Sequence, residues 1–318
     1  MRYAFFGTPP FAARLLELLL EAGLRPEFVV TQPDAASRRG STLWPSAVAE
    51  VAEREGLALE KPEKGRDSEF AARLNALHLD CVVVAAYGRI ITPALLQISQ
   101  QGWINVHTSL LPRWRGAAPI QRALLAGDEA TGVSIMRMEE GLDVGSYCAQ
   151  AQVAIGDQDL AQLEDTLATM SAELLISELP KIIDGTATWQ HQDEEQATYA
   201  QKIGKRELDL SPELSAEINV RKVRASSDSA PARLTLISGN REIPLRVLDA
   251  ELWPLAATQD SRAPGAVTIE SDRLALISSS TDTCCVISQL QPAGKRPQPA
   301  ADFLRGLRLD PEEPLSWQ

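Results

Sequence analysis

Four consecutive apolar residues, Cys81-Val82-Val83-Val84, constrain the fold of this chain more than any other segment. Three of the four are β-branched valines, and no polar residue interrupts the run. Such a pattern is typical of a strand that is covered on both faces, as strands are in a parallel sheet with helices on either side. The run therefore favours an α/β fold built on a parallel sheet.

Strand-like and helix-like segments alternate from the first residues to about residue 190, which supports this expectation. In the first predicted helix, Phe11, Leu15, Leu18 and Leu19 form the apolar stripe, and Gly23 is the expected stop. The predicted strands are Tyr3–Phe6, Glu27–Thr31, Cys81–Val84 and a strand that starts near Gly102 and ends close to His107. The predicted helices are Phe11–Glu21, Ser46–Glu55, a helix capped by Asp67 or Ser68 that carries Phe70, Leu74 and Leu77, and a helix near Leu160–Ile183. Together they predict a doubly wound, mostly parallel sheet of the Rossmann-like type.

The pattern changes after Gly185, where the chain becomes polar and irregular over residues 190–206. Short segments with alternating polarity follow, separated by glycine and polar turns. These segments are Ala232–Leu236, Ile243–Val247, Ala266–Ile269 and Cys285–Ile287. Their spacing predicts a small β-barrel. We therefore expect a first domain over residues 1–189, a linker over residues 190–206 and a second domain over residues 207–318.

The net charge of −12 does not suggest a chain that binds nucleic acid over its whole surface. The charge is uneven, because residues 1–200 carry 16 basic and 27 acidic side chains and residues 201–318 carry 15 and 16. Any contact with a polyanion must therefore be local. Two small basic clusters could make one: Lys202, Lys205 and Arg206, and Arg221, Lys222 and Arg224.

The four cysteines, Cys81, Cys148, Cys284 and Cys285, form no CxxC pair and no Cys/His spacing typical of a metal site. We expect reduced thiols and no bound metal. The sequence also shows no signal-peptide pattern and no apolar run long enough to cross a bilayer. These features predict a cytoplasmic protein that does not bind a membrane.

Asn105 and His107 are the strongest candidates for chemistry. They are separated by one residue in a predicted strand, so their side chains share one face of the sheet. The strand is expected to end at His107, and ligands of open parallel sheets collect at the carboxyl ends of the strands. Asp143 lies between Gly141 and Gly145, where the backbone can approach a planar ligand. An amide, an imidazole and a carboxylate are groups that acyl transfer uses.

These residues belong to motifs that resemble the formyltetrahydrofolate-dependent transferases and hydrolases. The shared motifs are Asn105-Val106-His107, Ser109-Leu110-Leu111-Pro112, Arg115-Gly116 and Leu142-Asp143-Val144-Gly145. Within that family, residues 109–121 (SLLPRWRGAAPIQ) are similar to the methionyl-tRNA formyltransferases. The same holds for Gly7-Thr8-Pro9, Thr31-Gln32-Pro33-Asp34, Ala86-Tyr87-Gly88, and the segments at 197–203 and 301–306. The resemblance runs from one end of the chain to the other.

The resemblance implies transfer of a formyl group from 10-formyltetrahydrofolate to the α-amine of methionyl initiator tRNA, without a metal. Asn105, His107 and Asp143 would be the catalytic residues. The folate donor would bind at Tyr87, Gly88, Arg89, Ile90, Ser109, Leu110, Leu111, Pro112, Gly141 and Leu142. The tRNA would bind at Arg38, Arg39, Lys202, Lys205 and Arg206. The second domain would be an OB-like barrel that assists tRNA binding, and we expect a monomer.

Two other readings remain open at this point. A related enzyme could use the same donor to formylate an amino-sugar nucleotide, or hydrolyse the donor without an acceptor. Alternatively, the chain could be a folate- or RNA-binding protein without catalysis. The barrel-like second domain and Thr31-Gln32-Pro33-Asp34 argue against the first reading, and the complete set of Asn105, His107 and Asp143 argues against the second.

Overall fold

A computed structural model describes residues 1–36, 43–63, 68–255, 263–280, 282–307 and 314–318. The described chain divides into two compact units. The first unit contains residues 1–119, 130–154 and 161–201, and the second contains residues 120–129, 155–160 and 202–318. No helix in these described ranges is both long and apolar enough to span a lipid bilayer.

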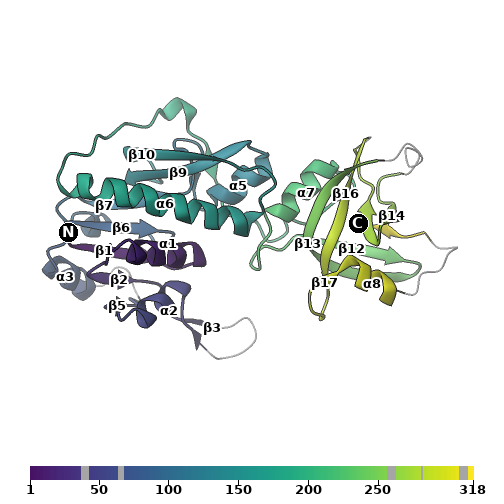
Figure 1. Ribbon diagram of the computed structural model, residues 1–318, viewed down its shortest axis with the longest axis horizontal. Helices are drawn as coiled ribbons and strands as arrows, with labels where there is room; N and C mark the ends of the chain where they lie inside the picture. The colour runs from purple at the N-terminus through teal and green to yellow at the C-terminus, as the bar shows by residue number, and fades with distance from the viewer. Residues whose placement is uncertain (37–42, 64–67, 256–262, 281, 308–313) are drawn as a thin grey trace. The chain divides into compact units, whose positions relative to one another are not determined.

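A seven-stranded sheet forms the centre of the first unit, with strand order β10-β9-β7-β6-β1-β2-β5 (Figure 1). Five of the strands pair in parallel: β1 (Tyr3–Gly7), β2 (Phe28–Val30), β5 (Leu59–Glu60), β6 (Cys81–Ala85) and β7 (Trp103–His107). Two antiparallel strands, β9 (Ala130–Arg137) and β10 (Tyr147–Ala154), extend the sheet beyond β7. The strand order reverses between β1 and β6, and such a switch point is where open α/β sheets bind ligands.

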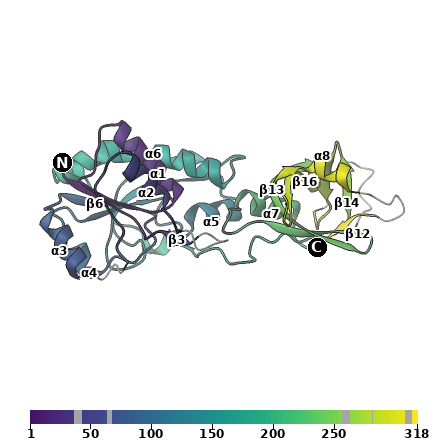
Figure 2. The ribbon, with the colours of Figure 1, turned by 90° about the horizontal axis from the view of Figure 1, so that it is seen from below.

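Helices cover both faces of this sheet, so the predicted doubly wound fold is confirmed. Helices α1 (Pro10–Glu21), α2 (Ala47–Arg54) and α6 (Leu160–Ile183) lie on one face, whereas α3 (Ser68–Ala76) and α4 (Pro93–Leu96) lie on the other (Figure 2). Phe70 of α3 and Leu95 of α4 pack in one buried cluster with Phe6 of β1 and Trp103 of β7. All five residues of β6 are buried, as the apolar run at Cys81–Val84 predicted.

Most predicted elements of the first unit lie where the sequence indicates. Ser46 caps α2 by accepting a hydrogen bond from the Ala49 amide, and Gly23 follows α1 with a positive φ of 80°. The predicted stripe of α1 is wrong at one position, because Leu16 is fully buried while Leu18 is partly exposed. A helix of 12 residues that packs on a sheet and on α2 buries a stripe wider than a strict i, i+4 pattern.

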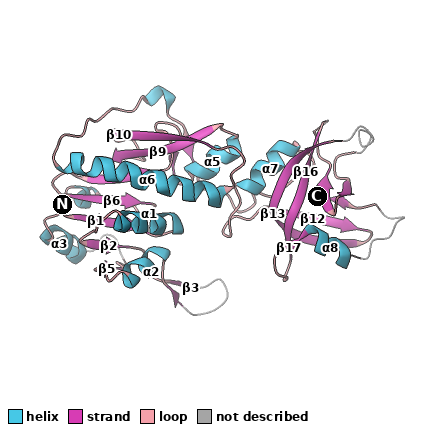
Figure 3. Cartoon of the chain, viewed as in Figure 1, coloured by secondary structure: helices cyan, strands magenta, loops and turns pink. Residues whose placement is uncertain are grey.

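The second unit is a strongly bent antiparallel sheet with strand order β14-β15-β16-β13-β12-β18 (Figure 3). Its strands are β12 (Arg233–Ser238), β13 (Arg241–Pro254), β14 (Val267–Glu270), β15 (Arg273–Leu276), β16 (Thr283–Pro292), β17 (Gln298–Pro299) and β18 (Ser316–Trp317). A bridge between Ala266 and Ser316 links the two ends of the sheet, and the Trp317 amide donates to the Gly265 carbonyl over 2.8 Å. The result is a nearly closed barrel, which confirms the prediction for this part of the chain.

Helices α7 (Ala216–Arg224) and α8 (Ala300–Gly306) pack against the barrel core. Ser215 caps α7 by accepting a hydrogen bond from the Ile218 amide. Val220 and Val223 of α7 and Phe303 of α8 join barrel residues in a single buried cluster. This cluster gives the second unit a core of its own.

The remaining elements are short. They are β3 (Ala35–Ala36) with β4 (Leu43–Trp44), β8 (Arg115–Gly116) with β11 (Tyr199–Ala200), helix α5 (Pro119–Ala126) and a 3₁₀ turn, η1 (Glu194–Gln196). The parallel pair β8–β11 joins the loop after β7 to residues that lie beyond α6. Residues 190–201, which form most of the linker predicted over residues 190–206, therefore pack beside the residues that follow β7.

Candidate active site

The candidate catalytic residues lie at the carboxyl end of the parallel strands. Strands β6 and β7 pair with Val84 opposite Asn105, so the two strands reach the same edge of the sheet. Asn105 and His107 are the third and fifth residues of β7, and His107 is its last residue. The sequence predicted both the end of the strand and the shared face of these two side chains.

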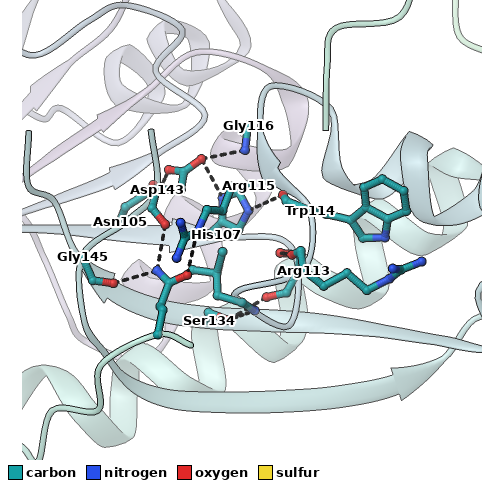
Figure 4. A network of polar contacts seen from close by, with 12 residues as sticks. Asn105, His107, Arg113, Trp114, Arg115, Gly116, Ser134, Asp143 and Gly145 are labelled. Atoms are coloured by element: carbon teal, nitrogen blue, oxygen red, sulfur yellow. Dashed lines mark hydrogen bonds and ion pairs between the residues drawn. The ribbon is translucent and has the colours of Figure 1, made fainter. Parts of the chain in front are cut away.

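Asn105 and Asp143 are joined by a hydrogen bond in which Nδ2 of Asn105 donates to Oδ1 of Asp143 over 3.3 Å (Figure 4). A carboxylate only accepts hydrogen bonds, so the amide must turn its nitrogen, not its oxygen, toward Asp143. An amide nitrogen carries two hydrogens, and this bond uses one of them. The bond therefore fixes the orientation of the Asn105 side chain and leaves an N–H that can be offered to a ligand.

His107 lies between two oxygen atoms. Its Nε2 is 2.9 Å from the carbonyl oxygen of Trp114, and its Nδ1 is 3.7 Å from Oδ2 of Asp143. The carbonyl can only accept, so we assign the Nε2 proton to this bond. The ring nitrogen beside Asp143 is then the one that can gain or lose a proton. His107 is 5% exposed, which keeps its ring in this orientation.

Asp143 accepts hydrogen bonds from two sides. Besides Asn105, the backbone amide of Gly116 donates to its Oδ2 over 2.8 Å. The residue has a positive φ of 55°, in the left-handed region that Asn and Asp enter more readily than most residues. This backbone conformation turns the carboxylate toward Asn105 and His107. The three predicted catalytic residues are therefore brought together in one cluster.

The predicted donor-binding loop Ser109–Pro112 is held by side chains from β9 and β10. Ser134 donates to the Ser109 carbonyl over 2.6 Å and accepts from the Leu111 amide over 3.1 Å. Gln150 donates to the Leu111 carbonyl over 2.9 Å and to the Ser134 hydroxyl over 2.8 Å. These bonds fix the backbone of the loop, which begins two residues after His107.

The second predicted donor-binding segment, Tyr87–Ile90, follows β6. Thr8 and Gln32 both donate to the Tyr87 carbonyl, over 3.0 and 2.8 Å, while Arg89 donates to the carbonyls of Pro62 and Glu63. The backbone is therefore anchored to neighbouring loops. The Ile90 side chain is 86% exposed.

The third segment, Gly141 and Leu142, precedes Asp143 in the chain. Gly141 has a φ of 129°, and Leu142 is 58% exposed. Ile90 and Leu142 are thus large apolar side chains that the protein leaves open to solvent. Exposed apolar side chains beside well-anchored backbone are suited to a flat, partly apolar ligand.

Three residues that the sequence did not single out for chemistry lie beside the cluster. Gln192 donates to the carbonyls of Asp143 and Gly145 over 2.7 and 2.8 Å, and it accepts from Nε of Arg115 over 2.9 Å. Arg115 is fully buried and binds Glu194 through two hydrogen bonds of 2.8 and 2.9 Å. This pairing raises the pKa of Arg115 and lowers that of Glu194. Glu194 and Gln192 lie in a polar, irregular segment, which gives no local signal that one of them is buried.

The basic residues predicted to meet tRNA have a different environment. Lys202, Lys205 and Arg206 are exposed, and Arg206 forms an ion pair of 2.7 Å with Asp209. Arg38 and Arg39 lie outside the described residues. Within the part of the chain that the structure describes, no three His, Cys, Asp or Glu side chains are grouped closely enough to hold a metal ion.

The amide, imidazole and carboxylate at the carboxyl edge of this Rossmann-like sheet are groups that acyl transfer uses. Comparison of the sequence with known families gives the particular family. The profile described as "Formyl transferase" matches residues 1–179, and the profile "Formyl transferase, C-terminal domain" matches residues 202–308. The chain belongs to the formyl transferase family. The family and the fold class predicted from the sequence are therefore confirmed.

Relatives of the same length support this assignment. The chain is 44% identical over 315 residues to a methionyl-tRNA formyltransferase of Halorhodospira halophila, and the matched residues make up 99% of each chain. It is 41% identical to a methionyl-tRNA formyltransferase of Thiobacillus denitrificans, over 97% of each chain. The prediction that the chain is a formyl transferase is confirmed by this similarity and by the family match.

Among solved structures, the fold is similar to HypX from Aquifex aeolicus in complex with tetrahydrofolic acid, with a TM-score of 0.63 and 16% identity. This likeness covers 98% of the present chain, which spans about half of HypX (48%). At this identity the comparison supports the fold alone.

Proposed function

We propose that this protein transfers the formyl group of 10-formyltetrahydrofolate to the α-amine of methionine esterified to initiator tRNA. The observation that carries the proposal is the joined cluster of Asn105, His107 and Asp143, in a chain that matches methionyl-tRNA formyltransferases from end to end. A tRNA substrate implies work in the cytoplasm, and we propose that the protein acts there as a monomer.

The reaction begins when the amine attacks the formyl carbon, and the carbonyl oxygen then gains negative charge. The second N–H of Asn105 donates a hydrogen bond to this oxyanion, while the first stays with Asp143. Removal of one such donor commonly costs roughly 3–4 kcal/mol of transition-state stabilisation. Because the amide is oriented before the substrate arrives, its donor needs no rearrangement during the reaction.

A proton must then move from the attacking nitrogen to N10 of the departing folate. Nδ1 of His107 is suited to take and release this proton, because Nε2 stays bonded to the Trp114 carbonyl. Asp143, 3.7 Å away, balances the positive charge of the imidazolium while it exists. The bond from the amine nitrogen to the formyl carbon forms, the bond from N10 breaks, and N10 leaves with the proton.

The donor is proposed to bind beside this cluster. Tyr87, Gly88, Arg89 and Ile90 would line one side, Ser109, Leu110, Leu111 and Pro112 a second, and Gly141 and Leu142 a third. The exposed side chains of Ile90 and Leu142 support this assignment, because a pteridine ring has apolar faces that they can cover. The anchored carbonyl and amide groups of these loops can meet the polar edge of the ring.

The acceptor is proposed to meet the exposed cations Lys202, Lys205 and Arg206, together with Arg38 and Arg39. These side chains would neutralise phosphates of the tRNA, which supplies affinity without reading bases. The barrel of residues 207–318, with its own core, is proposed as a second domain that assists this binding, after the linker at 190–206 and the catalytic domain at 1–189.

One assay separates this proposal from its alternatives. Purified protein and 10-formyltetrahydrofolate are incubated with methionyl initiator tRNA, with methionyl elongator tRNA, with an amino-sugar nucleotide, or without an acceptor. The proposal expects rapid formylation of the initiator alone. Release of tetrahydrofolate without an acceptor indicates hydrolysis, and formylation of an amino-sugar nucleotide in place of tRNA indicates the sugar-modifying alternative. Inactivity with every acceptor, while the donor still binds, indicates a binding protein.

A further inference from the structure

Gln192 is a buried residue in a segment that is otherwise mostly exposed. It is 9% exposed, whereas both of its neighbours, His191 and Asp193, are exposed. Three of the four hydrogen-bonding positions of its side chain have partners: Nε2 donates twice, and Oε1 accepts once. A side chain fixed at three points in this way has a single orientation.

The two carbonyl groups that Gln192 binds belong to Asp143 and Gly145, on either side of Val144. The turn that contains them belongs to no helix or strand, and Asp143 has a positive φ of 55°. An unusual backbone conformation persists only where surrounding groups hold it. Gln192 supplies two of these restraints through its hydrogen bonds of 2.7 and 2.8 Å to the carbonyls of Asp143 and Gly145. Asp143 is also the residue that orients Asn105 and faces His107.

Arg115 determines which way the Gln192 amide points. A guanidinium only donates hydrogen bonds, so the atom of Gln192 that faces Nε of Arg115 must be Oε1, and the NH₂ group must face the two carbonyls. Arg115 is fully buried and its charge is balanced by Glu194 through two hydrogen bonds. A chain of contacts thus leads from Glu194 through Arg115 and Gln192 to Asp143.

The same segment also holds the other side of the cluster. The hydroxyl of Thr198 accepts from the Trp114 amide over 2.9 Å, and the carbonyl of Thr198 accepts from the Arg115 amide over 2.8 Å. The Trp114 carbonyl is the group that binds Nε2 of His107. Gln192 and Thr198 therefore support the two groups that flank the His107 ring, which are the Asp143 turn and the Trp114 backbone.

We propose that Gln192 is a positioning residue for formyl transfer: through Arg115 and Glu194 it is locked in the orientation that holds the Asp143 turn, and so Asp143, in place. The inference deepens the proposed function and rests on it for its kinetic test. It gives a positioning role in catalysis to residues that follow α6 and that the sequence predicted to be part of the linker at 190–206.

Gln192→Glu tests the proposal most directly. The substitution keeps the size of the side chain and an oxygen for Arg115, but it replaces both N–H donors with an oxygen that faces two carbonyl oxygens. We expect the kcat of formyl transfer to fall roughly 10- to 100-fold, as restraints on catalytic groups commonly contribute. KM for tRNA should stay within about threefold, because Gln192 is not among the proposed tRNA contacts.

Two variants serve as controls. Gln190→Glu makes the same chemical change at an exposed side chain two residues away and should keep parental kcat. Glu194→Ala removes the balancing charge from Arg115, and its surface position favours a folded variant; we expect kcat to fall about fivefold. In the Gln192→Glu background the same Glu194→Ala change should have little further effect, because the new carboxylate at position 192 already pairs with Arg115.

Hydrogen–deuterium exchange provides a readout that does not depend on the reaction. In Gln192→Glu, the amides of residues 141–147 should exchange at least about tenfold faster, while peptides from β1 and β6 keep parental rates.

Parental kcat in a folded Gln192→Glu protein would overturn the proposal, as would unchanged exchange in the turn. If the parent protein formylates no acceptor, the proposed function fails, and the exchange experiment alone decides on Gln192. If Gln192→Glu does not fold, Glu194→Ala decides: parental kcat in that variant overturns the proposal.

Discussion

The Nδ2 atom of Asn105 donates to Oδ1 of Asp143, although the two residues are 38 positions apart in the chain. This bond joins the end of a buried strand to a short irregular turn, and it determines the direction in which the second N–H of Asn105 points. Because Asp143 contacts both Asn105 and His107, its removal should affect both residues together.

Asp143→Asn should keep the fold and lower kcat at least tenfold. The substitution preserves shape, and Asn tolerates the positive φ at this position, whereas the negative charge beside His107 is lost. Steady-state kinetics and circular dichroism would check this, with Glu140→Gln on the same exposed turn as the control. Asp143→Ala should be at least as slow. A near-parental rate in Asp143→Asn would remove the charge of Asp143 from the mechanism.

Gly116→Ala should destabilise the protein by about 1–3 kcal/mol and also slow the reaction. Gly116 has a φ of 128°, and an added Cβ would lie 2.7 Å from the Ala200 carbonyl oxygen in β11. Its amide also donates to Asp143. Gly156→Ala is the matched control, because it has a positive φ but meets no atom within 4 Å. Thermal unfolding should show a larger loss for Gly116→Ala, and equal losses would contradict the close approach described here.

Glu217 should make the stability of the protein depend on pH in the acid range. The hydroxyl of Thr283 donates to its carboxylate over 2.6 Å and that of Ser280 over 3.3 Å, and these bonds lower its pKa to about 2. Because the folded pKa lies below the unfolded value of 4.5, the stabilisation is complete above that value and is lost as the pH falls toward 2.

Glu217→Gln should therefore lower the stability at pH 7 by about 1 kcal/mol, after allowance for solvent screening. The difference from the parent should shrink by more than half at pH 3. Thermal unfolding at the two pH values measures this, and Glu213→Gln, at an exposed glutamate, should show no difference at either pH. If the difference in stability between the parent and Glu217→Gln stays constant with pH, the carboxylate of Glu217 is not the source of the stabilisation.

The double variant Lys202→Ala/Lys205→Ala should bind tRNA more weakly, but its rate of formyl transfer once tRNA is bound should not change. We expect KM for tRNA to rise several-fold at physiological salt, and the slope of log affinity against log salt to fall by about 1 to 2. The kcat at saturating tRNA should stay near the parental value. Lys295→Ala, an exposed lysine outside the proposed contact, is the control. An unchanged salt slope would exclude both lysines from the tRNA contact.

Local pattern was sufficient for much of the first unit. The apolar run at Cys81–Val84 indicated a doubly covered strand, and the two-residue spacing of Asn105 and His107 placed both side chains on one face. Strands β9 and β10 were not foreseen. Polar residues such as Ser134 and Gln150 interrupt their apolar pattern, because these side chains turn inward to hold the Ser109–Pro112 loop.

The support around the candidate site could not be read from the sequence, because it depends on contacts between distant segments. Arg115 and Gln192 are 77 positions apart, and nothing local marks either as a buried pair. The barrel was predicted from four short segments, yet β15 at Arg273–Leu276 was missed and β13 and β16 proved longer than expected. Long bent strands with irregular register, such as β13 against β16, interrupt strict alternation.

The single-turnover rate of formyl transfer by the Asn105→Ala variant tests the role of the Asn105 amide most directly. Enzyme, with donor already bound, is mixed with methionyl initiator tRNA, and formylmethionyl-tRNA is quantified over time for the parent, for Asn105→Ala and for the exposed-site control Asn75→Ala. We expect rapid transfer by the parent and the control, and a rate roughly 100- to 1,000-fold lower for Asn105→Ala. Equal rates in all three proteins would contradict the assignment of the Asn105 amide to the developing oxyanion.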